Sequence, residues 1–368
     1  MKKKIFIIHQ YIGLVTGLLM FLTSISGALY VFEKELFHAF HHDVLYVDQI
    51  GDQSLPIDKL WDIAQREVDG YDITSVKTYQ DPSRSWEFKS YHQDNSAVTY
   101  FDWITQDKIV YINPYNGKVI GLLNHKYEFF QLVKMFHWSY FLRTAYGQPI
   151  VGAVTLLFFI CLITGLWLWW PKKGIKKGAF KLRFNKWRVL NRDIHFTLGA
   201  LTFPLAIVIC ITGMIWAFRW MMAIVYLIFN LGVNSYDTTV PKSIVDHQDI
   251  GIYQEVYSTC KDIYTDAYAI SIYQPKKSKE STVNVFVQND KAVYYNSARL
   301  SFNQYNGHLV RSSSFEEASS GEKAIMLNYD IHVGAIGGIF GKILMFLIAI
   351  VLAALPITGY FLWVNKKK

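Results

Sequence analysis

Four long apolar runs limit what this chain can fold into. They cover residues 5–32, 149–170, 194–218 and 340–364. Each run is long enough for a helix to cross a hydrocarbon core of about 30 Å, which takes roughly 20 residues. None of the runs alternates polar and apolar residues, which excludes a transmembrane β-barrel. The sequence therefore predicts an α-helical membrane protein with a four-helix transmembrane bundle.

Basic residues gather at one end of all four runs. Three lysines precede the first run, nine lysines and arginines lie between residues 172 and 192, and three lysines end the chain. The positive-inside rule places this end, with both termini, in the cytoplasm. The other 22 basic residues stand against 29 acidic ones, although the whole chain carries a formal charge of +8. The two long connections are thus net acidic, and we expect them outside the cytoplasm with no nucleic-acid partner.

These signals divide the chain into eight segments. The first apolar run is longer than the core of a usual secretory signal, so we expect it to be retained as a membrane helix. The predicted membrane helices are 1–32, 148–171, 193–218 and 339–365, the predicted periplasmic domains are 33–147 and 219–338, and the predicted cytoplasmic parts are the loop 172–192 and the tail 366–368.

The two halves of the chain repeat each other. His9 and His195 are each followed by glycines at the fourth and the eighteenth positions. The segment LITGLWLWWPKK at 162–173 matches PITGYFLWVNKK at 356–367. We interpret the chain as two tandem units, each a helix, an outer domain and a helix. Because both units start on the cytoplasmic side, the repeat is parallel, with an axis along the membrane normal.

Each outer connection has the pattern of a small α+β module. Helices are predicted at 55–68 and 252–264, and Asn-Gly turns follow in both modules. The predicted strands are 73–79, 85–91, 97–104, 108–114 and 118–123 in the first module, and 269–275, 281–288, 291–297, 299–303 and 308–310 in the second. Cys260 is the sole cysteine in these connections, so no intrachain disulfide is expected.

Four histidines occupy equivalent places in the repeat. His9 and His195 lie near the cytoplasmic ends of their helices, and His137 and His332 lie at the outer face. Two-fold symmetry brings one pair together on each face, which is the ligand set of a six-coordinate haem iron. A lone histidine is often an ordinary core or interfacial residue, but four at symmetric membrane positions favour function. A zinc or copper site is the other ligand interpretation, and it requires three or four ligands close together.

Glycines and arginines near these histidines fit a large flat cofactor. Gly13 and Gly199 lie one helical turn beyond their histidines, where a missing side chain lets a porphyrin approach. Small residues also simply pack membrane helices. Arg192 and Arg143 lie at the membrane margins, where they could pair with haem propionates or serve as interfacial charges.

The remaining chemistry in the sequence is sparse. His38, His41 and His42 form a cluster beyond the first helix, which is either a solvated surface or a metal site. The chain has no phosphate-binding loop, dinucleotide glycine motif or HExxH motif. Electrons for a redox reaction would therefore come from outside the chain, from a quinol or a cytoplasmic flavoprotein.

Several segments together resemble the PepSY-associated transmembrane family, also described as iron-regulated membrane proteins. KIVYINPYNGKVIGLL at 108–123 is similar to the PepSY strand–turn–strand signature, and RLSFNQYNGHLV is its second copy, with Gln304 in place of proline. NRDIHFTLGAL at 191–201 and NYDIHVGAIGGIFGKIL at 328–344 resemble the histidine–glycine segments of the family. The resemblance covers nearly the whole chain.

Members of this family include inner-membrane ferric-siderophore reductases with b-type haems between four helices. The resemblance implies two haem b groups here, bacterial inner-membrane localisation, and reduction of ferric iron in a siderophore or other chelate on the periplasmic side. His195 and His332 match the family segments best, and His9 matches an opening His-x-x-x-Gly. After His137 the glycine-rich stretch is reduced to Gly147 and Gly152.

Two other functions compete with a reductase. A membrane-anchored PepSY module would bind, inhibit or chaperone a protease and would not need the four histidines. A transporter for iron or a chelate would suit a tandem repeat, but four helices make a small pathway.

Overall fold

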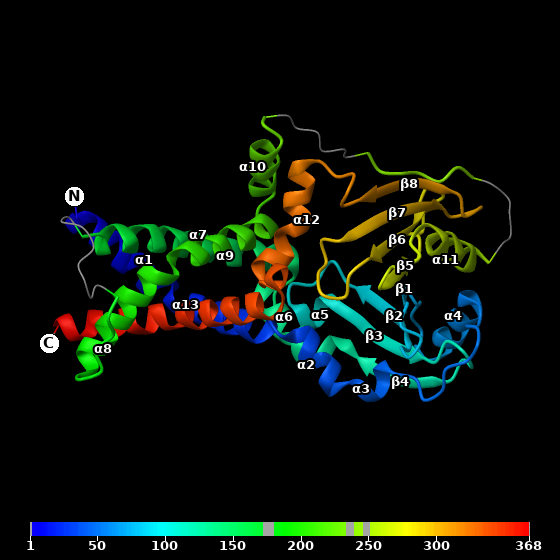
Figure 1. Cartoon of the computed structure of the whole chain (residues 1–368), viewed down its shortest axis with the longest axis horizontal. Helices are drawn as coiled ribbons and strands as arrows, with labels where there is room; N and C mark the ends of the chain where they lie inside the picture. Colours follow the sequence, from blue (N-terminus) through cyan, green and yellow to red (C-terminus); the bar gives the residue numbers. More distant parts are fainter. Residues whose placement is uncertain (1, 172–179, 233–238, 246–250, 368) are drawn as a thin grey trace. The chain divides into compact units, whose positions relative to one another are not determined.

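The computed structural model describes residues 2–171, 180–232, 239–245 and 251–367. These residues form two compact units (Figure 1). The first unit comprises Met1–Glu33, Val133–Ile224 and Asn328–Lys368, and the second comprises Lys34–Leu132 and Val225–Leu327. Part of the predicted cytoplasmic loop, with Lys172, Lys173, Lys176 and Lys177, lies outside the described residues, as does Lys368.

The first unit contains the four predicted membrane helices. In its described residues, four helical segments are long and apolar enough to cross a membrane, each with an 18-residue window of mean hydropathy 2.0 or more. The elements are α1 (Lys2–Tyr30), α7 (Thr144–Trp169), the continuous run of α8 (Trp187–Asp193), η2 (Ile194–Leu198) and α9 (Gly199–Ala217), and α13 (Gly338–Lys367). The chain is therefore a multi-pass membrane protein.

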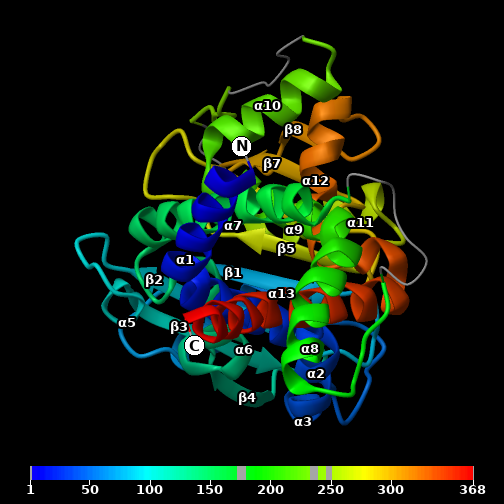
Figure 2. The same cartoon turned by 90° about the vertical axis from the view of Figure 1, so that its left-hand side faces the viewer.

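These helices pack around a shared apolar interior. Helix α1 lies against α7 and α13, and α9 lies against the same two helices (Figure 2). Their contact is filled by a cluster of buried side chains that includes Met20, Phe158, Ala206 and Leu352. The first residues of α1 and the last residues of α13 lie at the same end of the bundle, as the charge pattern predicted.

Short helices extend the first unit beyond the four long ones. They are α6 (Phe129–Ser139), α10 (Arg219–Phe229), α12 (Ser320–His332) and η3 (Ala335–Gly337). The last turns of α6 and α12 belong to the first unit. His137 and His332 therefore lie with the membrane helices, although the predicted periplasmic segments 33–147 and 219–338 included both residues.

The second unit is built on one antiparallel sheet of eight strands, in the order β4-β3-β2-β1-β5-β6-β7-β8. The strands are β1 (Ser75–Tyr79), β2 (Trp86–Gln93), β3 (Ile104–Ile112), β4 (Val119–Asn124), β5 (Ala269–Tyr273), β6 (Thr282–Gln288), β7 (Ser297–Asn303) and β8 (Leu309–Ser314). The connecting helices are α2 (Glu33–Phe40), α3 (His42–Leu45), α4 (Ile57–Arg66), α5 (Tyr100–Trp103), η1 (His125–Tyr127) and α11 (Ile252–Ile263).

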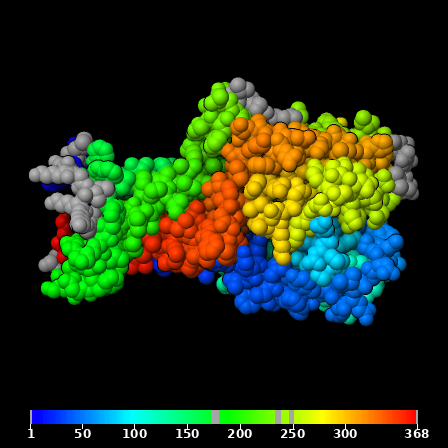
Figure 3. All heavy atoms as spheres, viewed as in Figure 1, coloured from blue at the N-terminus to red at the C-terminus, as the bar shows by residue number. Residues whose placement is uncertain are grey.

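The two outer modules join through strands β1 and β5. Lys77 pairs with Ser271 at the centre of this contact, with two further pairs on each side. Helices α4 and α11 bury their apolar faces in one core with the sheet, where Leu60, Phe88 and Phe302 are fully buried. Figure 3 shows second-module residues, yellow to orange, directly against first-module residues, cyan to blue. The predicted modules thus share one sheet and one core.

The two Asn-Gly turns have the same geometry. Gly117 N–H donates to Asn113 O and Gly307 N–H donates to Asn303 O, both at 3.0 Å. Both glycines have positive φ, which L side chains rarely adopt. Gln304, which replaces the proline of the first copy, leaves this turn unchanged.

Two of the predicted strands are wrong. Residues 100–103 form helix α5, because the Thr99 side chain caps it by accepting a hydrogen bond from Asp102 N–H at 3.3 Å. Most of 291–297 is a loop that joins β6 to β7. Gln288 Nε2 donates to Val293 O at 3.2 Å and so holds this loop in a turned form instead of an extended one.

Candidate metal centres

The ring of His9 faces the ring of His195 near the end of the bundle where α1 begins. His9 lies on α1 and His195 on η2, and their ring centroids are 6.3 Å apart with an interplanar angle of 78°. Element η2 is a single turn of π-helix. Such turns are often found at functional sites, because they shift the side chains that follow.

A second pair lies near the other end of the bundle. His137, in the last turn of α6, and His332, at the end of α12, also have ring centroids 6.3 Å apart, at an angle of 57°. The structure thus brings together both of the histidine pairs that the repeat predicted.

The separation of 6.3 Å in both pairs suits one metal ion between two rings. An imidazole nitrogen binds a transition metal at about 2 Å and lies about 1.2 Å from its own ring centre. Two rings on opposite sides of a metal therefore have centroids about 6 Å apart. In the described residues, no group of three or more His, Cys, Asp and Glu side chains could hold a metal, so each site rests on two imidazoles.

Hydrogen bonds fix which ring nitrogen of His9 can bind a metal. His9 Nδ1 lies 3.1 Å from both Cys161 O and Thr164 Oγ1 on α7. The Thr164 hydroxyl donates its own hydrogen to Ile160 O at 2.8 Å and so can only accept from the ring. Nδ1 therefore carries the hydrogen, and Nε2 keeps the lone pair that a metal needs.

The same bonding recurs at the other three histidines. Each Nδ1 faces the hydroxyl of a Thr or Ser that donates to a backbone carbonyl of its own helix. The contacts are His195 with Leu355 O (3.1 Å) and Thr358 Oγ1 (3.0 Å), His137 with Thr23 O (2.9 Å) and Ser26 Oγ (3.3 Å), and His332 with Thr212 Oγ1 (2.7 Å).

A glycine follows each of these hydroxyl residues and lies against the same ring. A Cβ on the glycine would lie 2.9–3.5 Å from the Cε1 atom of the histidine. The contacts are Gly165 with His9, Gly359 with His195, Gly27 with His137 and Gly213 with His332. We call each hydroxyl residue and its glycine a cradle. An isoleucine precedes each of the four cradles, so the sequence signal for these contacts is the triplet Ile-Thr/Ser-Gly at 25–27, 163–165, 211–213 and 357–359.

The cradles explain the 18-residue spacing in the repeat. Eighteen residues make five turns of an α-helix, so His9 and Gly27 lie on the same face of α1, about 27 Å apart. His195 and Gly213 have the same spacing. Helix α1 and the continuous run of η2 and α9 each supply a histidine to one pair and a cradle to the other.

Neither Gly13 nor Gly199 lies against a histidine ring in the described structure, and their contact with a porphyrin stays a prediction. A Cβ on Gly13 would have no described atom within 4 Å, and a Cβ on Gly199 would meet Leu355 at 3.4 Å. Gly147 packs directly on the backbone of Ser139, two residues after His137. The reduced glycine stretch after His137 thus still allows a close approach of α7.

The predicted arginines contact side chains other than the four histidines. Arg192 Nε is 3.6 Å from Asp193 Oδ1, which also receives a 2.7 Å bond from Arg183. The Arg143 guanidinium lies 5.1 Å from the centre of the Tyr146 ring. Their role as partners of haem propionates stays a prediction.

The outer histidine cluster does not converge on one point. His42 stacks on the Tyr46 ring at 4.5 Å, and His41 Nε2 lies 3.8 Å from Glu128 Oε1. Burial and the nearby Arg84 charge lower the pKa of His38 to about 4. Because the histidines have separate partners, the described residues do not form a preformed metal site at this cluster.

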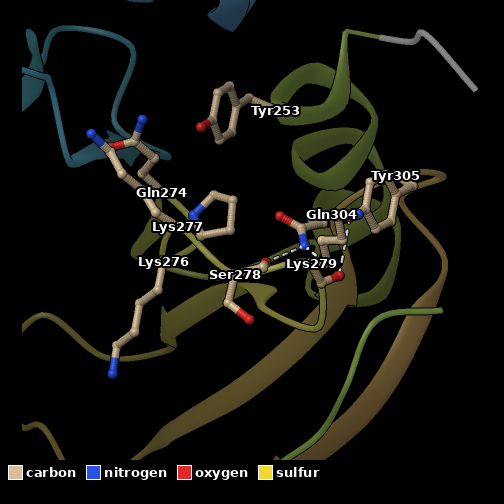
Figure 4. A pocket seen from close by; sticks show the side chains of 9 residues that line it. Tyr253, Gln274, Lys276, Lys277, Ser278, Lys279, Gln304 and Tyr305 are labelled. Atoms are coloured by element: carbon tan, nitrogen blue, oxygen red, sulfur yellow. Dashed lines mark hydrogen bonds between the residues drawn. The ribbon is translucent and has the colours of Figure 1, made fainter. Parts of the chain in front are cut away.

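The second unit has an open cavity of about 420 Å³ beside the β5–β6 connection (Figure 4). Its rim holds Lys276, Lys277 and Lys279. Gln304 Nε2 donates to Ser278 O at 2.8 Å and to Lys279 O at 2.9 Å. The residue that replaces proline in the second turn therefore holds the lysine-rich loop in place.

Comparison with known proteins agrees with the resemblance seen in the sequence. The family model described as "PepSY-associated TM region" matches residues 6–366, which span both units and all four histidines. No curated protein matches the chain.

Proposed function

Because the chain belongs to the PepSY-associated TM region family, we propose that it is a diheme membrane protein that reduces ferric iron in siderophores or other chelates. The observation that carries this proposal is the presence of two equivalent histidine pairs in one membrane bundle. A protein that only anchors a binding module has no use for two such pairs, because polar side chains in a membrane are costly.

The residues at both sites fit haem b. His9 and His195 would hold the cytoplasmic-side haem, and His137 and His332 the periplasmic-side haem. Each ring keeps Nε2 available through its Nδ1 bonds. When bound, the two haems supply one-electron transfer between the faces of the membrane.

The chain's own residues set the conditions for that transfer. The Nδ1 bonds fix the orientation of each ring, so the ligands need little rearrangement when the charge on the metal changes. Buried Phe158, Leu162 and Leu352 between the helices exclude water from the bundle. We further propose that the chain is a tandem repeat in the bacterial inner membrane, with both termini in the cytoplasm.

The substrate and the electron donor lie on opposite sides in this proposal. A quinol in the bilayer or a cytoplasmic flavoprotein supplies electrons at the side of His9. A ferric siderophore accepts them on the periplasmic side. Ferrous iron binds siderophores far more weakly than ferric iron, so one-electron reduction is enough to release the metal.

An absorption spectrum of the full chain, produced with adequate haem and purified in detergent, tests the proposal. We expect a Soret band that shifts on reduction, and two haems per chain. The variants H195A and H332A should each lose about half of this signal, whereas H92A, in the second unit, should lose none. A wild-type protein without a Soret band would contradict the reductase and favour the binding-module hypothesis.

A further inference from the structure

Two buried asparagines lie behind two of the four cradles. Asn191 Nδ2 donates to Thr358 O, and Asn328 Nδ2 donates to Thr212 O, both at 3.1 Å. Thr358 and Thr212 are the hydroxyl residues that face His195 and His332. Each asparagine therefore bonds to the residue that holds the histidine of its own segment.

The local sequence explains this arrangement. Both asparagines stand four residues before their histidine, in the segments NRDIH at 191–195 and NYDIH at 328–332. A separation of four residues places two side chains on the same helix face, one turn apart. The asparagine and the histidine can thus contact the same cradle on a neighbouring helix, α13 in one case and α9 in the other.

The bonding also fixes how each amide group is oriented. Because Nδ2 must face a carbonyl, Oδ1 points the other way. Asn191 and Asn328 are only 1% and 2% exposed. Both Oδ1 atoms are buried without a hydrogen-bond partner in the described structure. A buried acceptor without a donor destabilises the folded state, so these asparagines are poor choices for stability alone.

The first half of the chain has no such residues. The positions four residues before His9 and His137 hold Ile5 and Val133. In the part of the chain that the structure describes, each histidine pair therefore has one ring whose cradle is bonded to an asparagine and one ring whose cradle has no such bond.

We propose that Asn191 and Asn328 are positioning residues, each for the haem on its own face of the membrane. Asn191 holds the Thr358 cradle and so orients His195 at the cytoplasmic-side haem. Asn328 holds the Thr212 cradle and so orients His332 at the periplasmic-side haem. This inference rests on the proposed function.

The test uses N191L and N328L in the full chain. Leucine nearly matches asparagine in shape and removes the unpartnered acceptor along with the donor, so a purely structural role predicts little loss of stability. For positioning residues we expect haem retention to fall by about tenfold at the same face only, with a shift in that haem's midpoint potential and EPR g-values. I5L and V133L, at the matching positions of the first half, should leave both haems unchanged.

The two haems are separated by measuring N191L in the H332A background and N328L in the H195A background. N191S and N328S, which keep a small polar side chain, replace the leucine variants if those fail to fold. Unchanged potentials and g-values in the asparagine variants, or equal changes at both haems, would overturn the inference. Absence of haem from the wild type would instead overturn the proposed function.

Discussion

The ring centroids of His9 and His195 lie 6.3 Å apart, and each ring contacts a glycine of a different helix. His9 contacts Gly165 of α7, and His195 contacts Gly359 of α13. The geometry of the pair therefore depends on four helical segments at once.

Replacing a cradle glycine should move a histidine ring. In G27A, the new Cβ would lie 2.9 Å from His137 Cε1, closer than real contacts allow. Alanine favours a helix over glycine by about 1 kcal/mol, so the substitution does not weaken helix α1. Loss of the periplasmic-side haem signal would therefore result from displacement of the His137 ring. G13A is the control, because its Cβ meets open space. A larger effect of G13A would support the predicted porphyrin contact at Gly13 instead.

Removing a cradle hydroxyl should change the electronic properties of its histidine. T164V keeps the shape of the side chain and the Cys161 carbonyl but takes one acceptor from His9 Nδ1. The ring then donates less electron density, so we expect a higher midpoint potential for the cytoplasmic-side haem and up to about tenfold weaker haem retention. T164S should restore both values. Equal midpoint potentials in T164V and wild type would show that the Cys161 carbonyl alone sets the electronic properties of the His9 ring.

The fully buried carboxylate of Asp107 should make the second unit sensitive to acid. Asp107 pairs with Lys89 Nζ and His125 Nδ1, each at 2.9 Å. Burial raises its pKa, but the hydrogen bond from His125 and the charge of Lys89 outweigh burial, and the net pKa is lowered. Its stabilisation is therefore present above the unfolded pKa near 3.9 and is lost as the pH falls through the lower folded value.

The variant D107N should thus lose about 2–4 kcal/mol of stability at pH 7, because it breaks a buried ion pair. Hydrogen exchange of the β2 and β3 amides measures this loss. The difference from wild type should shrink below pH 4. A difference that stays constant down to pH 3 would show that the charge of Asp107 is not its cause.

Gln304 should control the motion of the lysine-rich loop. Q304A removes two hydrogen bonds to the carbonyls of Ser278 and Lys279. Each such bond contributes about 1 kcal/mol, so local opening should become at least about tenfold more frequent. Trypsin cleavage after Lys276, Lys277 or Lys279 reports this opening. P114A, at the equivalent position of the first turn, is the control and should leave the cleavage rate unchanged.

The sequence predicted the membrane helices and the histidine pairs, which depend on composition and on periodic spacing. Apolar runs about 25 residues long must span a membrane or be buried, so the four helices followed directly from hydropathy. The duplicated His–Gly spacing then predicted which histidines pair. The first prediction uses information carried within single segments and the second compares the two halves of the chain. The described structure contains these helices and both close pairs.

What the sequence did not predict depends on partners from other segments. The bond from Asn191 to Thr358 joins residues on different helices, and no periodic pattern within either helix shows it. The pairing of β1 with β5 is also long-range, and strand propensity does not choose between an exposed edge and a partner strand. The alternating pattern of segment 97–104 favours a strand and conceals the Thr99 cap.

The β1–β5 contact relates the two modules by local symmetry. Both strands end at a tyrosine, and counting back from there makes Lys77 and Ser271 equivalent positions. The antiparallel register is centred on these two residues, which is the register that a two-fold axis gives to two identical strands. The two outer edges of the sheet, β4 and β8, are correspondingly the strands that follow the two Asn-Gly turns.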